Sequence, residues 1–356
     1  MASVNKQLVV LVKKGREYWN ASNGYDLRLI NLSAEDKNSL LRFVPCFEQN
    51  RNTVILRGNA VIDCTGIDFR TYIRICLTHR VFFRNIVLQD SFFKYCRTKL
   101  KFLARAGFWR LMGFRFSIQL PKSFIDQMLY GIFLKRIAFV SSADFFSRKI
   151  FKGKYFRIAN GIANRTYISL PPDARRAHGR GIRFCFWGNI DYEPNFLSTV
   201  YFLRQYWCQL QCDFPDSELN IYGGGQSKIM GLANKLRLDI SHVHFCGRFE
   251  KVEDIAIYND VCVNLVEFGA GMMNKTIEAV AIGIPMVTTS HAIEGIPELR
   301  DYPFVYHDYP SLKLAICNLM KSNEENRRRL AITILDNYRW EKTYKDYVGL
   351  FLRGQE

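Results

Sequence analysis

The chain has 356 residues, is 48% hydrophobic and 23% charged, and carries a formal net charge of +17. This length suits two domains with full cores, and the composition excludes a disordered or fibrous protein. Ten cysteines without a CxxC pair and six scattered histidines argue against a zinc site and favour buried, reduced thiols in a cytosolic protein. We also expect no membrane span and no signal peptide, because no apolar run is long enough.

The charge is divided unevenly along the chain. Residues 1–180 hold 32 Lys and Arg against 11 Asp and Glu, a balance of +21, whereas residues 181–356 have a balance of −4. A basic half predicts an anionic partner, such as nucleic acid, anionic lipid or a phosphorylated substrate. The sign changes at the polar segment 163–181, which contains Pro171 and Pro172 and is typical of a linker.

Apolar runs in the first half predict strands within residues 6–15, 52–64, 84–90, 136–142 and 155–162. These strands fit a doubly wound parallel sheet, the kind of fold in which ligands bind beyond the carboxyl ends of the strands.

Three polar residues of this half follow apolar runs. Asp90 is a candidate catalytic base or ligand of an acceptor hydroxyl, and its alternative role is the N-cap of a helix that starts near Phe92. His79 is a weaker candidate base, with a structural or solvated histidine as the alternative. Asp144 is best interpreted as a helix cap.

Residues 91–125 contain eight Lys and Arg, nine aromatic residues and no Asp or Glu. Such a segment can lie on an anionic membrane surface, with its cations at the headgroups and its rings below them. The alternatives are a packed helix with a solvated basic face and a nucleic-acid contact. We favour the membrane surface and expect no nucleic acid.

The second half alternates strand and helix patterns, which predicts repeated β-α-β units and a parallel sheet. Strands are expected within residues 182–190, 218–225, 242–248, 285–290 and 304–308, and helices within 193–211, 228–238 and 274–284. Glycines fall where the strands end, and they include Gly188, Gly223 and Gly247.

The segment 267–289 carries the most specific signal. Gly269, Ala270 and Gly271 allow close approach of a bulky phosphate to the start of a helix, which attracts anions. Lys275 adds a positive charge, and Glu278 lies on the same helical face, where its carboxylate suits the vicinal hydroxyls of a ribose. This chemistry predicts a nucleoside diphosphate site, and the alternative is a Gly-rich turn before an ordinary helix with a solvated Lys-Glu pair.

Four segments of the second half together resemble the nucleotide-binding domain of GT-B glycosyltransferases, most of all the family 4 group. They are "FWGNIDYEPN", "LNIYGGG", "VHFCGRFEKVEDIAIYNDVCVNLVEFGAGMMNKTIEAVAIGIPMVTTSHAIEGI" and "YRWEKTY". In the first half only "AFVSSADFFSRKIF" and "YFRIANGI" resemble this family.

The resemblance implies a GT-B fold, in which two Rossmann-like domains with parallel sheets face an interdomain cleft. It implies an acceptor-binding domain at residues 1–165, a linker at 166–181, a nucleotide-sugar domain at 182–338 and a closing helix at 339–356 that crosses back to the first domain.

The resemblance also implies residue roles. Lys275 contacts phosphate and serves in catalysis, Glu278 contacts ribose, and the loop with Gly188, Asn189 and Asn195 covers the diphosphate. Arg248 and Phe249 lie near the base. Many family members have a second glutamate, which contacts the donor sugar, at the position of Ala270, and the nearby Glu267 does not obviously replace it. This departure bears on the donor sugar and the stereochemistry.

The activity that the resemblance implies is transfer of a sugar from a nucleotide-diphosphate sugar to an acceptor hydroxyl, without a metal or other cofactor. The expected acceptor is a lipid-linked or cell-surface polysaccharide or lipopolysaccharide precursor, reached from the cytoplasm at the inner face of the cell membrane. The alternatives are a sugar-nucleotide 2-epimerase on the same fold and a non-catalytic GT-B relic that binds membrane or nucleic acid.

Overall fold

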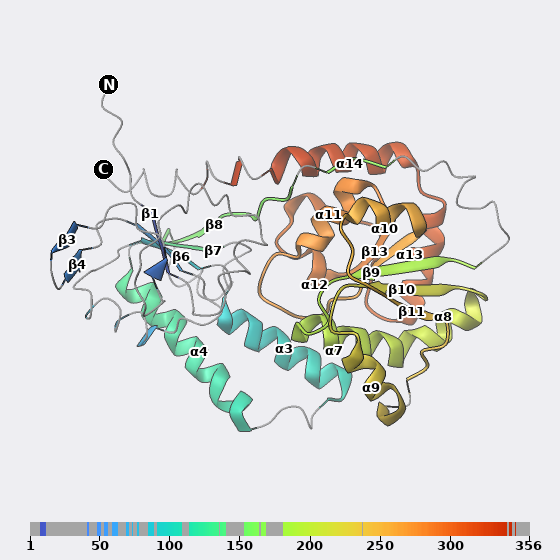
Figure 1. Ribbon diagram of the computed structural model, residues 1–356, viewed down its shortest axis with the longest axis horizontal. Coiled ribbons are helices and arrows are strands. Elements are labelled where there is room, and N and C mark those ends of the chain that lie inside the picture. Colours follow the sequence, from blue (N-terminus) through green and yellow to red (C-terminus); the bar gives the residue numbers. More distant parts are fainter. Residues whose placement is uncertain are drawn as a thin grey trace. The chain divides into compact units, whose positions relative to one another are not determined.

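The structure is a computed structural model, and its sheets and helices fall into two compact units (Figure 1). The first unit comprises residues 1–163 and 340–356, and the second comprises residues 164–339. The residues that the structure describes are 8–11, 41–42, 48–50, 53–55, 59–62, 69–70, 73, 77, 85–88, 91–108, 114–134, 136–139, 153–163, 165–168, 181–236, 238–339, 342–343 and 346.

The first unit contains a six-stranded sheet in the order β2-β1-β5-β6-β7-β8. All its pairs are parallel except β1 with β2, and β3 and β4 form a separate antiparallel pair. The strands are β1 (Leu8–Leu11), β2 (Leu41–Arg42), β3 (Glu48–Asn50), β4 (Thr53–Ile55), β5 (Asn59–Ile62), β6 (Asn85–Leu88), β7 (Arg136–Phe139) and β8 (Tyr155–Arg157).

Two helices, α3 (Phe92–Ala106) and α4 (Phe114–Phe133), connect β6 to β7 and pack against each other. The Ser91 hydroxyl caps α3 by accepting from the Lys94 amide at 3.1 Å, and the same hydroxyl donates to Gln127 of α4. Gly107 ends α3 with a φ of 70°, a left-handed conformation that glycine adopts without strain. The helix therefore starts at Phe92 as expected, but its cap is Ser91 and not Asp90.

The second unit is a fully parallel sheet in the order β11-β10-β9-β12-β13-β14. In chain order this is 3-2-1-4-5-6, the doubly wound arrangement in which the strand order reverses beside the first strand. The strands are β9 (Arg183–Trp187), β10 (Glu218–Tyr222), β11 (Val243–Gly247), β12 (Val261–Asn264), β13 (Met286–Thr289) and β14 (Val305–Tyr306).

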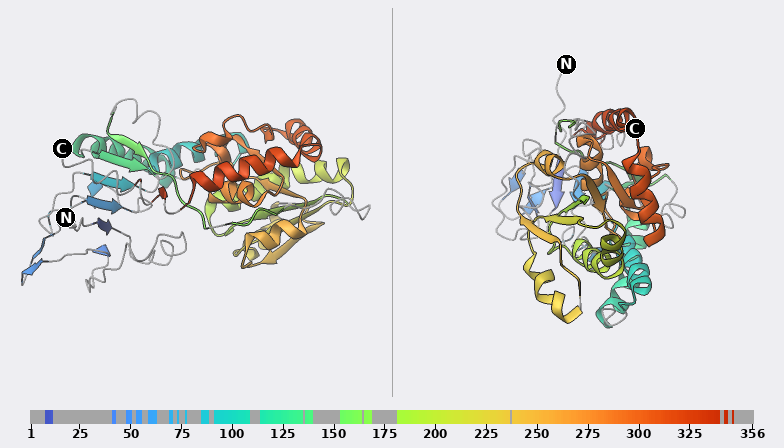
Figure 2. Two further views of the ribbon diagram at one scale, coloured as in Figure 1. Left: turned by 90° about the horizontal axis from the view of Figure 1, so that it is seen from above. Right: turned by 90° about the vertical axis from the view of Figure 1, so that its right-hand side faces the viewer.

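Helices cover both faces of this second sheet. The helices are α7 (Glu193–Phe202), η3 (Leu203–Trp207), α8 (Cys208–Asp213), α9 (Ser227–Leu236), α10 (Val252–Tyr258), α11 (Asn274–Ile282), α12 (Ser290–Ile293), η4 (Pro297–Leu299), α13 (Tyr309–Met320) and α14 (Glu324–Asn337). In Figure 1, α7, α8 and α9 lie on one face, and α10, α11 and α14 lie on the other. Figure 2 shows α9 (yellow) and α14 (red) on different sides of the strands.

The predicted helix at 193–211 is one continuous run of α7, η3 and α8, with Pro194 in its first turn as expected. The middle part, η3, is a π-helix, which the sequence pattern did not predict. The buried Trp207 of η3 packs edge-on against Phe184 of β9, with 6.4 Å between ring centroids.

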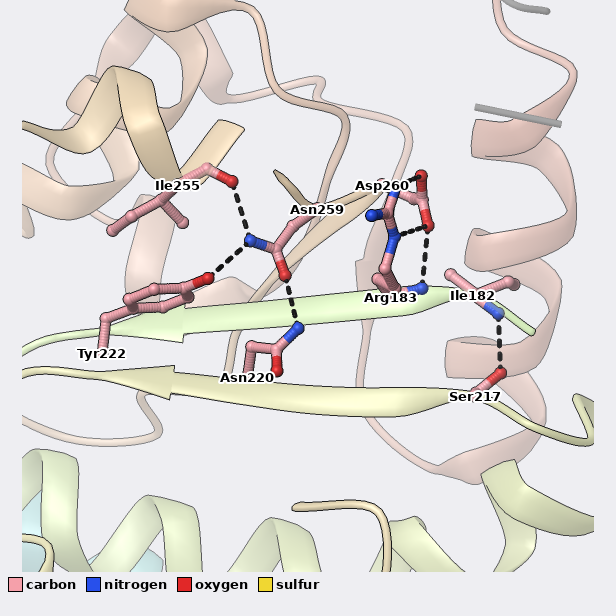
Figure 3. A network of polar contacts seen from close by, with 8 residues as sticks. All are labelled: Ile182, Arg183, Ser217, Asn220, Tyr222, Ile255, Asn259 and Asp260. Atoms are coloured by element: carbon pink, nitrogen blue, oxygen red, sulfur yellow. Dashed lines mark hydrogen bonds and ion pairs between the residues drawn. The ribbon is translucent and has the colours of Figure 1, made fainter. Parts of the chain in front are cut away.

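A polar network ties the strands of the second sheet together (Figure 3). Asn259 accepts from Asn220 at 2.8 Å and donates to the Tyr222 hydroxyl at 3.0 Å and to the Ile255 carbonyl at 2.7 Å. At the opposite end of β9, Asp260 accepts from the Arg183 amide at 2.8 Å. These bonds join β9 and β10 to the α10–β12 turn.

Every strand predicted from the sequence has a counterpart in the structure, and residues 52–64 contain two strands, β4 and β5, where one was expected. The predicted closing helix lies mostly outside the described residues. Within it, the Thr343 hydroxyl donates to the Ala159 carbonyl at 3.0 Å, a contact inside the first unit. The residue bounds and the roles of the predicted domains remain predictions.

The cysteine prediction holds only in part. Cys96, Cys185 and Cys262 are buried, but Cys208, Cys212 and Cys246 are exposed. Within the described part of the chain, none of the helices combines the length and the apolar character that a membrane crossing needs.

The Asn259 network yields a stability prediction. We expect Asn259→Ala to lower the free energy of unfolding by about 1–3 kcal/mol, because it removes three hydrogen bonds of a buried amide and leaves the half-buried Asn220 and Tyr222 without this partner. Chemical denaturation followed by tryptophan fluorescence checks this. The exposed Gln205→Ala serves as a control and should stay within about 0.5 kcal/mol of the wild type. An Asn259→Ala variant as stable as this control would contradict the structural role of the network.

Candidate functional site

The strand order of the second sheet reverses between β9 and β12, at whose carboxyl ends the predicted site residues lie. From β9 the chain proceeds to β10 on one side and later to β12 on the other, so loops leave the strand ends in opposite directions. Such a switch point is where doubly wound sheets bind ligands. The loop after β9 begins with Gly188, and the loop after β12 contains Gly269, Ala270 and Gly271. The predicted site residues therefore cluster at one edge of the sheet.

The centre of the site is the ammonium of Lys275, in the first turn of α11. Its Nζ donates to Asn195 Oδ1 on α7 at 2.8 Å and lies 4.0 Å from the centroid of the buried Phe186 ring. The other side of the same amide, Asn195 Nδ2, donates to the Asn189 carbonyl at 2.8 Å. One chain of contacts thus joins α11, α7 and the β9 loop.

Gly188 lies directly over this pair. Its φ is 149°, and a Cβ here would come within 2.7 Å of Lys275 Nζ and 2.8 Å of Asn195 Nδ2. Gly223, at the end of β10, has a φ of 128°, and a Cβ there would meet the Gly188 carbonyl at 2.1 Å. Gly223 requires glycine because its backbone touches that of Gly188, and Gly188 favours glycine because of its positive φ. Because Gly188 has no side chain, the Lys275 ammonium lies close to the backbone of this loop.

Burial lowers the pKa of Lys275 to about 7, and the nearby Cys262 and Glu278 offset part of this effect. Among the described residues, this amine contacts one hydrogen-bond acceptor, Asn195 Oδ1, and the ring face of Phe186. A phosphate at this place would supply the missing negative charge and favour the protonated amine.

Glu278, one turn further along α11, is held from two directions. Its Oε1 accepts from Arg165 Nη2 at 2.8 Å, and its Oε2 accepts from the indole of Trp187 at 3.3 Å. Arg165 also lies 3.7 Å from a carboxylate oxygen of Glu253 on α10. The expected ribose ligand is therefore a fixed carboxylate and not a solvated one.

The loop before α11 closes another side of the site. Ala270 is almost fully buried, and Gly269 has a φ of 153°. A Cβ on Gly269 would lie 3.0 Å from Met273 Cε and 3.5 Å from His291 Nε2. That histidine nitrogen is buried and has no hydrogen-bond partner in the described part of the chain, while Nδ1 lies 3.4 Å from Glu294.

The region expected to hold the base lies at the ends of β10 and β11. Phe249 packs edge-on against Tyr222, with 6.4 Å between ring centroids, and Arg248 is exposed. Asn259 fixes the Tyr222 hydroxyl (Figure 3), and burial raises the pKa of this tyrosine to about 12. Tyr222 thus stays neutral at physiological pH and offers an aromatic edge.

The structure brings together Gly188, Asn189, Asn195 and Lys275, and it places Glu278 on the same helix as Lys275. The candidates Asp90, His79 and Asp144 lie outside the described residues. Sequence reasoning missed Phe186, Trp187 and Arg165. The two aromatic residues stand in the predicted strand that ends at Gly188, and this position was the available signal. No sequence signal indicated Arg165, because its partner Glu278 is 113 positions away.

The lysine predicts a pH dependence of anion binding. In the free protein Lys275 loses its charge above pH 7, and a bound diphosphate favours the charged form, so binding takes up a proton. We expect the affinity for a nucleoside diphosphate to fall between pH 7.5 and 9.5 by up to about tenfold per pH unit. Isothermal titration in several buffers measures both the slope and the proton uptake.

Lys275→Met should bind weakly and lose this slope. The control Lys228→Met removes an exposed lysine that pairs with Asp191 at 3.6 Å, and it should keep the slope. A Lys275→Met variant with the wild-type pH profile would show that another group controls binding.

Comparison with known proteins agrees with this geometry. Residues 181–322 match the family model described as glycosyl transferases group 1. No curated protein matches the chain in sequence.

Solved structures with a similar fold have low sequence identity. TarM has a TM-score of 0.55 and 11% identity, over 82% of this chain and 54% of its own, so the chain spans about half of TarM. HepE from Anabaena, in complex with UDP and glucose, has a TM-score of 0.50 and 12% identity, over 82% of this chain and 90% of its own.

Sucrose-phosphate synthase from Thermosynechococcus elongatus has a TM-score of 0.51 and 15% identity, over 83% of this chain and 73% of its own. The resemblance expected from the sequence is confirmed, and the matches support a glycosyltransferase. The chain has the GT-B type of fold, and the match to the glycosyl transferases group 1 model covers the greater part of its second unit, residues 181–322.

Proposed function

We propose that the protein transfers a sugar from a nucleoside diphosphate sugar to an acceptor hydroxyl. The observation that carries the proposal is the Lys275 ammonium, held by Asn195 beneath Gly188 at the switch point of the second sheet. A full positive charge at the start of a nine-residue helix, beside a close-packed glycine loop, suits a diphosphate. Glu278 then lies one turn away, where the ribose would sit.

The chemistry needs the bond between the sugar and the β-phosphate oxygen to break. Negative charge develops on that oxygen, and Lys275 stabilises it from a fixed position without reorganisation of solvent. The acceptor oxygen forms the new bond to the sugar and releases its proton. Asp90, outside the described residues, is our proposed base for that proton.

A uridine nucleotide is the first donor to test, because HepE, with a similar fold, is in complex with UDP and glucose. We further propose that the acceptor is a lipid-linked or cell-surface polysaccharide or lipopolysaccharide precursor, and that the protein binds the inner face of the cell membrane as a peripheral protein. The support for this second proposal comes from the first unit.

Helices α3 and α4 carry the features that suit an anionic membrane surface. Ile118, Ile125 and Ile132 of α4 are 51%, 55% and 56% exposed, and their seven-residue spacing puts them on one helical face. Lys101 and Arg105 of α3 are exposed cations. Lys94, in contrast, is 3% exposed, so the expectation that every cation of 91–125 meets lipid needs this correction.

Donor use is tested by thermal shift and transfer assays with UDP, GDP and ADP sugars. We expect Lys275→Ala to lower transfer by about 10²–10³-fold, as removal of a preorganised charge does in other active sites. Lys228→Ala, a nearby exposed lysine, should retain activity. Equal activity of the Lys275→Ala and Lys228→Ala variants would remove the basis of the proposal, and turnover of the donor without any acceptor would favour the epimerase.

Membrane binding is tested by sedimentation with vesicles of increasing phosphatidylglycerol content. Each exposed cation contributes on the order of 1 kcal/mol near such a surface, so Lys101→Glu with Arg105→Glu should reduce binding at least about tenfold. Ile125→Ser with Ile132→Ser should also reduce it. Lys251→Glu with Lys321→Glu, which changes two exposed lysines of the second unit, is the matched control. Vesicle binding that does not change with the phosphatidylglycerol content would contradict this part of the proposal.

A further inference from the structure

We infer that Arg165 is a positioning residue for nucleotide recognition: its guanidinium holds the Glu278 carboxylate in the orientation that accepts the ribose hydroxyls. The inference rests on the proposed function, because it assigns ribose to Glu278. It adds a residue from the segment that leads into the second unit, where a linker was expected.

Two side chains from different segments hold the Glu278 carboxylate in place. Arg165 Nη2 donates to Oε1 at 2.8 Å, and Trp187 Nε1 donates to Oε2 at 3.3 Å. The side chains of Arg165 and Glu278 are each 19% exposed. Two donors on different oxygens fix both the position of the carboxylate and the plane in which its remaining lone pairs lie.

Arg165 itself is held by its neighbours in the chain. The Ile168 amide donates to the Ile282 carbonyl at the end of α11 at 2.9 Å. The ring of Tyr167 covers Gly283 so closely that a Cβ there would lie 2.3 Å from it. From Arg165 to Ile168 the chain therefore runs along α11 from its middle to its end, and this path places the guanidinium beside Glu278.

The carboxylate keeps its capacity for a ligand. Two oxygens offer about four acceptor positions, of which Arg165 and Trp187 occupy one each. The described residues place no further donor on the carboxylate, so one position on each oxygen stays available, which matches the two hydroxyls of a ribose.

Charge gives Arg165 a second role at the same place. Glu278 stands three residues from Lys275, where a diphosphate is proposed to bind, and an unpaired carboxylate would repel that anion. Arg165 offsets the carboxylate charge at 2.8 Å and reaches Glu253 at 3.7 Å. A lysine carries the same charge but lacks the planar fork that serves two carboxylates at once.

A purely structural role is the competing explanation, in which Arg165 only ties residues 165–168 to α11. The two roles differ in one observable. A structural tie affects every nucleotide equally, whereas a positioning residue for Glu278 weakens ligands that carry both ribose hydroxyls more than those that lack one. Discrimination between ribonucleotides and 2′-deoxyribonucleotides separates them.

The experiment is isothermal titration of the full chain with UDP, GDP and ADP, each beside its 2′-deoxy counterpart. The variants are Arg165→Met, Arg165→Lys, Glu278→Gln, the double variant of Arg165→Met with Glu278→Gln, and the control Glu325→Gln. Glu325 is an exposed glutamate of α14 that pairs with Arg329 at 3.1 Å, so its variant should keep the discrimination of the wild type.

We expect the wild type to prefer a ribonucleotide by about tenfold or more, and Arg165→Met to reduce that preference to about twofold. The unpaired Glu278 charge should in addition weaken both nucleotides by the same factor, which leaves the preference itself unaffected. Arg165→Lys should restore part of it. The double variant should be no weaker than Glu278→Gln, because the arginine acts through the glutamate.

Two results would overturn the inference while the proposed function stands: equal weakening of both nucleotides by Arg165→Met, or additive losses in the double variant. Failure of the wild type to bind any nucleoside diphosphate would instead refute the proposed function, and the inference with it.

Discussion

The hydrogen bond between Lys275 and Asn195 organises the second unit of this protein. It is made by two helices that belong to different β-α-β units, and it lies under a loop that follows the central strand. Because each partner is placed by its own strand end, the bond forms only when the sheet has its 3-2-1-4-5-6 order. The ammonium, the glycine loop and the start of α11 therefore depend on one topology.

The candidate anion site does not lie in the basic half of the chain. The basic excess lies in the first half of the chain, while the lysine that suits a diphosphate stands in the half with a balance of −4. At the site, the Lys275 ammonium acts at short range, through its place beside Asn195 and the start of α11. Exposed cations of the first half, such as Lys101 and Arg105, act at longer range, and salt screens their attraction.

Much of the second unit follows from its sequence, because periodic apolar runs and glycines mark where strands end, and parallel strands bring those ends together. Gly188, Asn195 and Lys275 could be grouped for that reason. Arg165 could not, because an ion pair across 113 positions has no local pattern. Composition also could not tell that Lys94 faces inward, or that Ser91 caps α3 in place of Asp90, because both depend on how α3 packs on α4.

The touching backbones of Gly188 and Gly223 have a consequence for variation of the site. A methyl group on Gly223 would meet the Gly188 carbonyl, and one on Gly188 would meet the Lys275 ammonium, so each position resists substitution on its own. A mutational library aimed at new donors would therefore lose members at these two codons. Diversity is better introduced at Arg248, whose side chain is exposed, so that the contact between the two glycines is preserved.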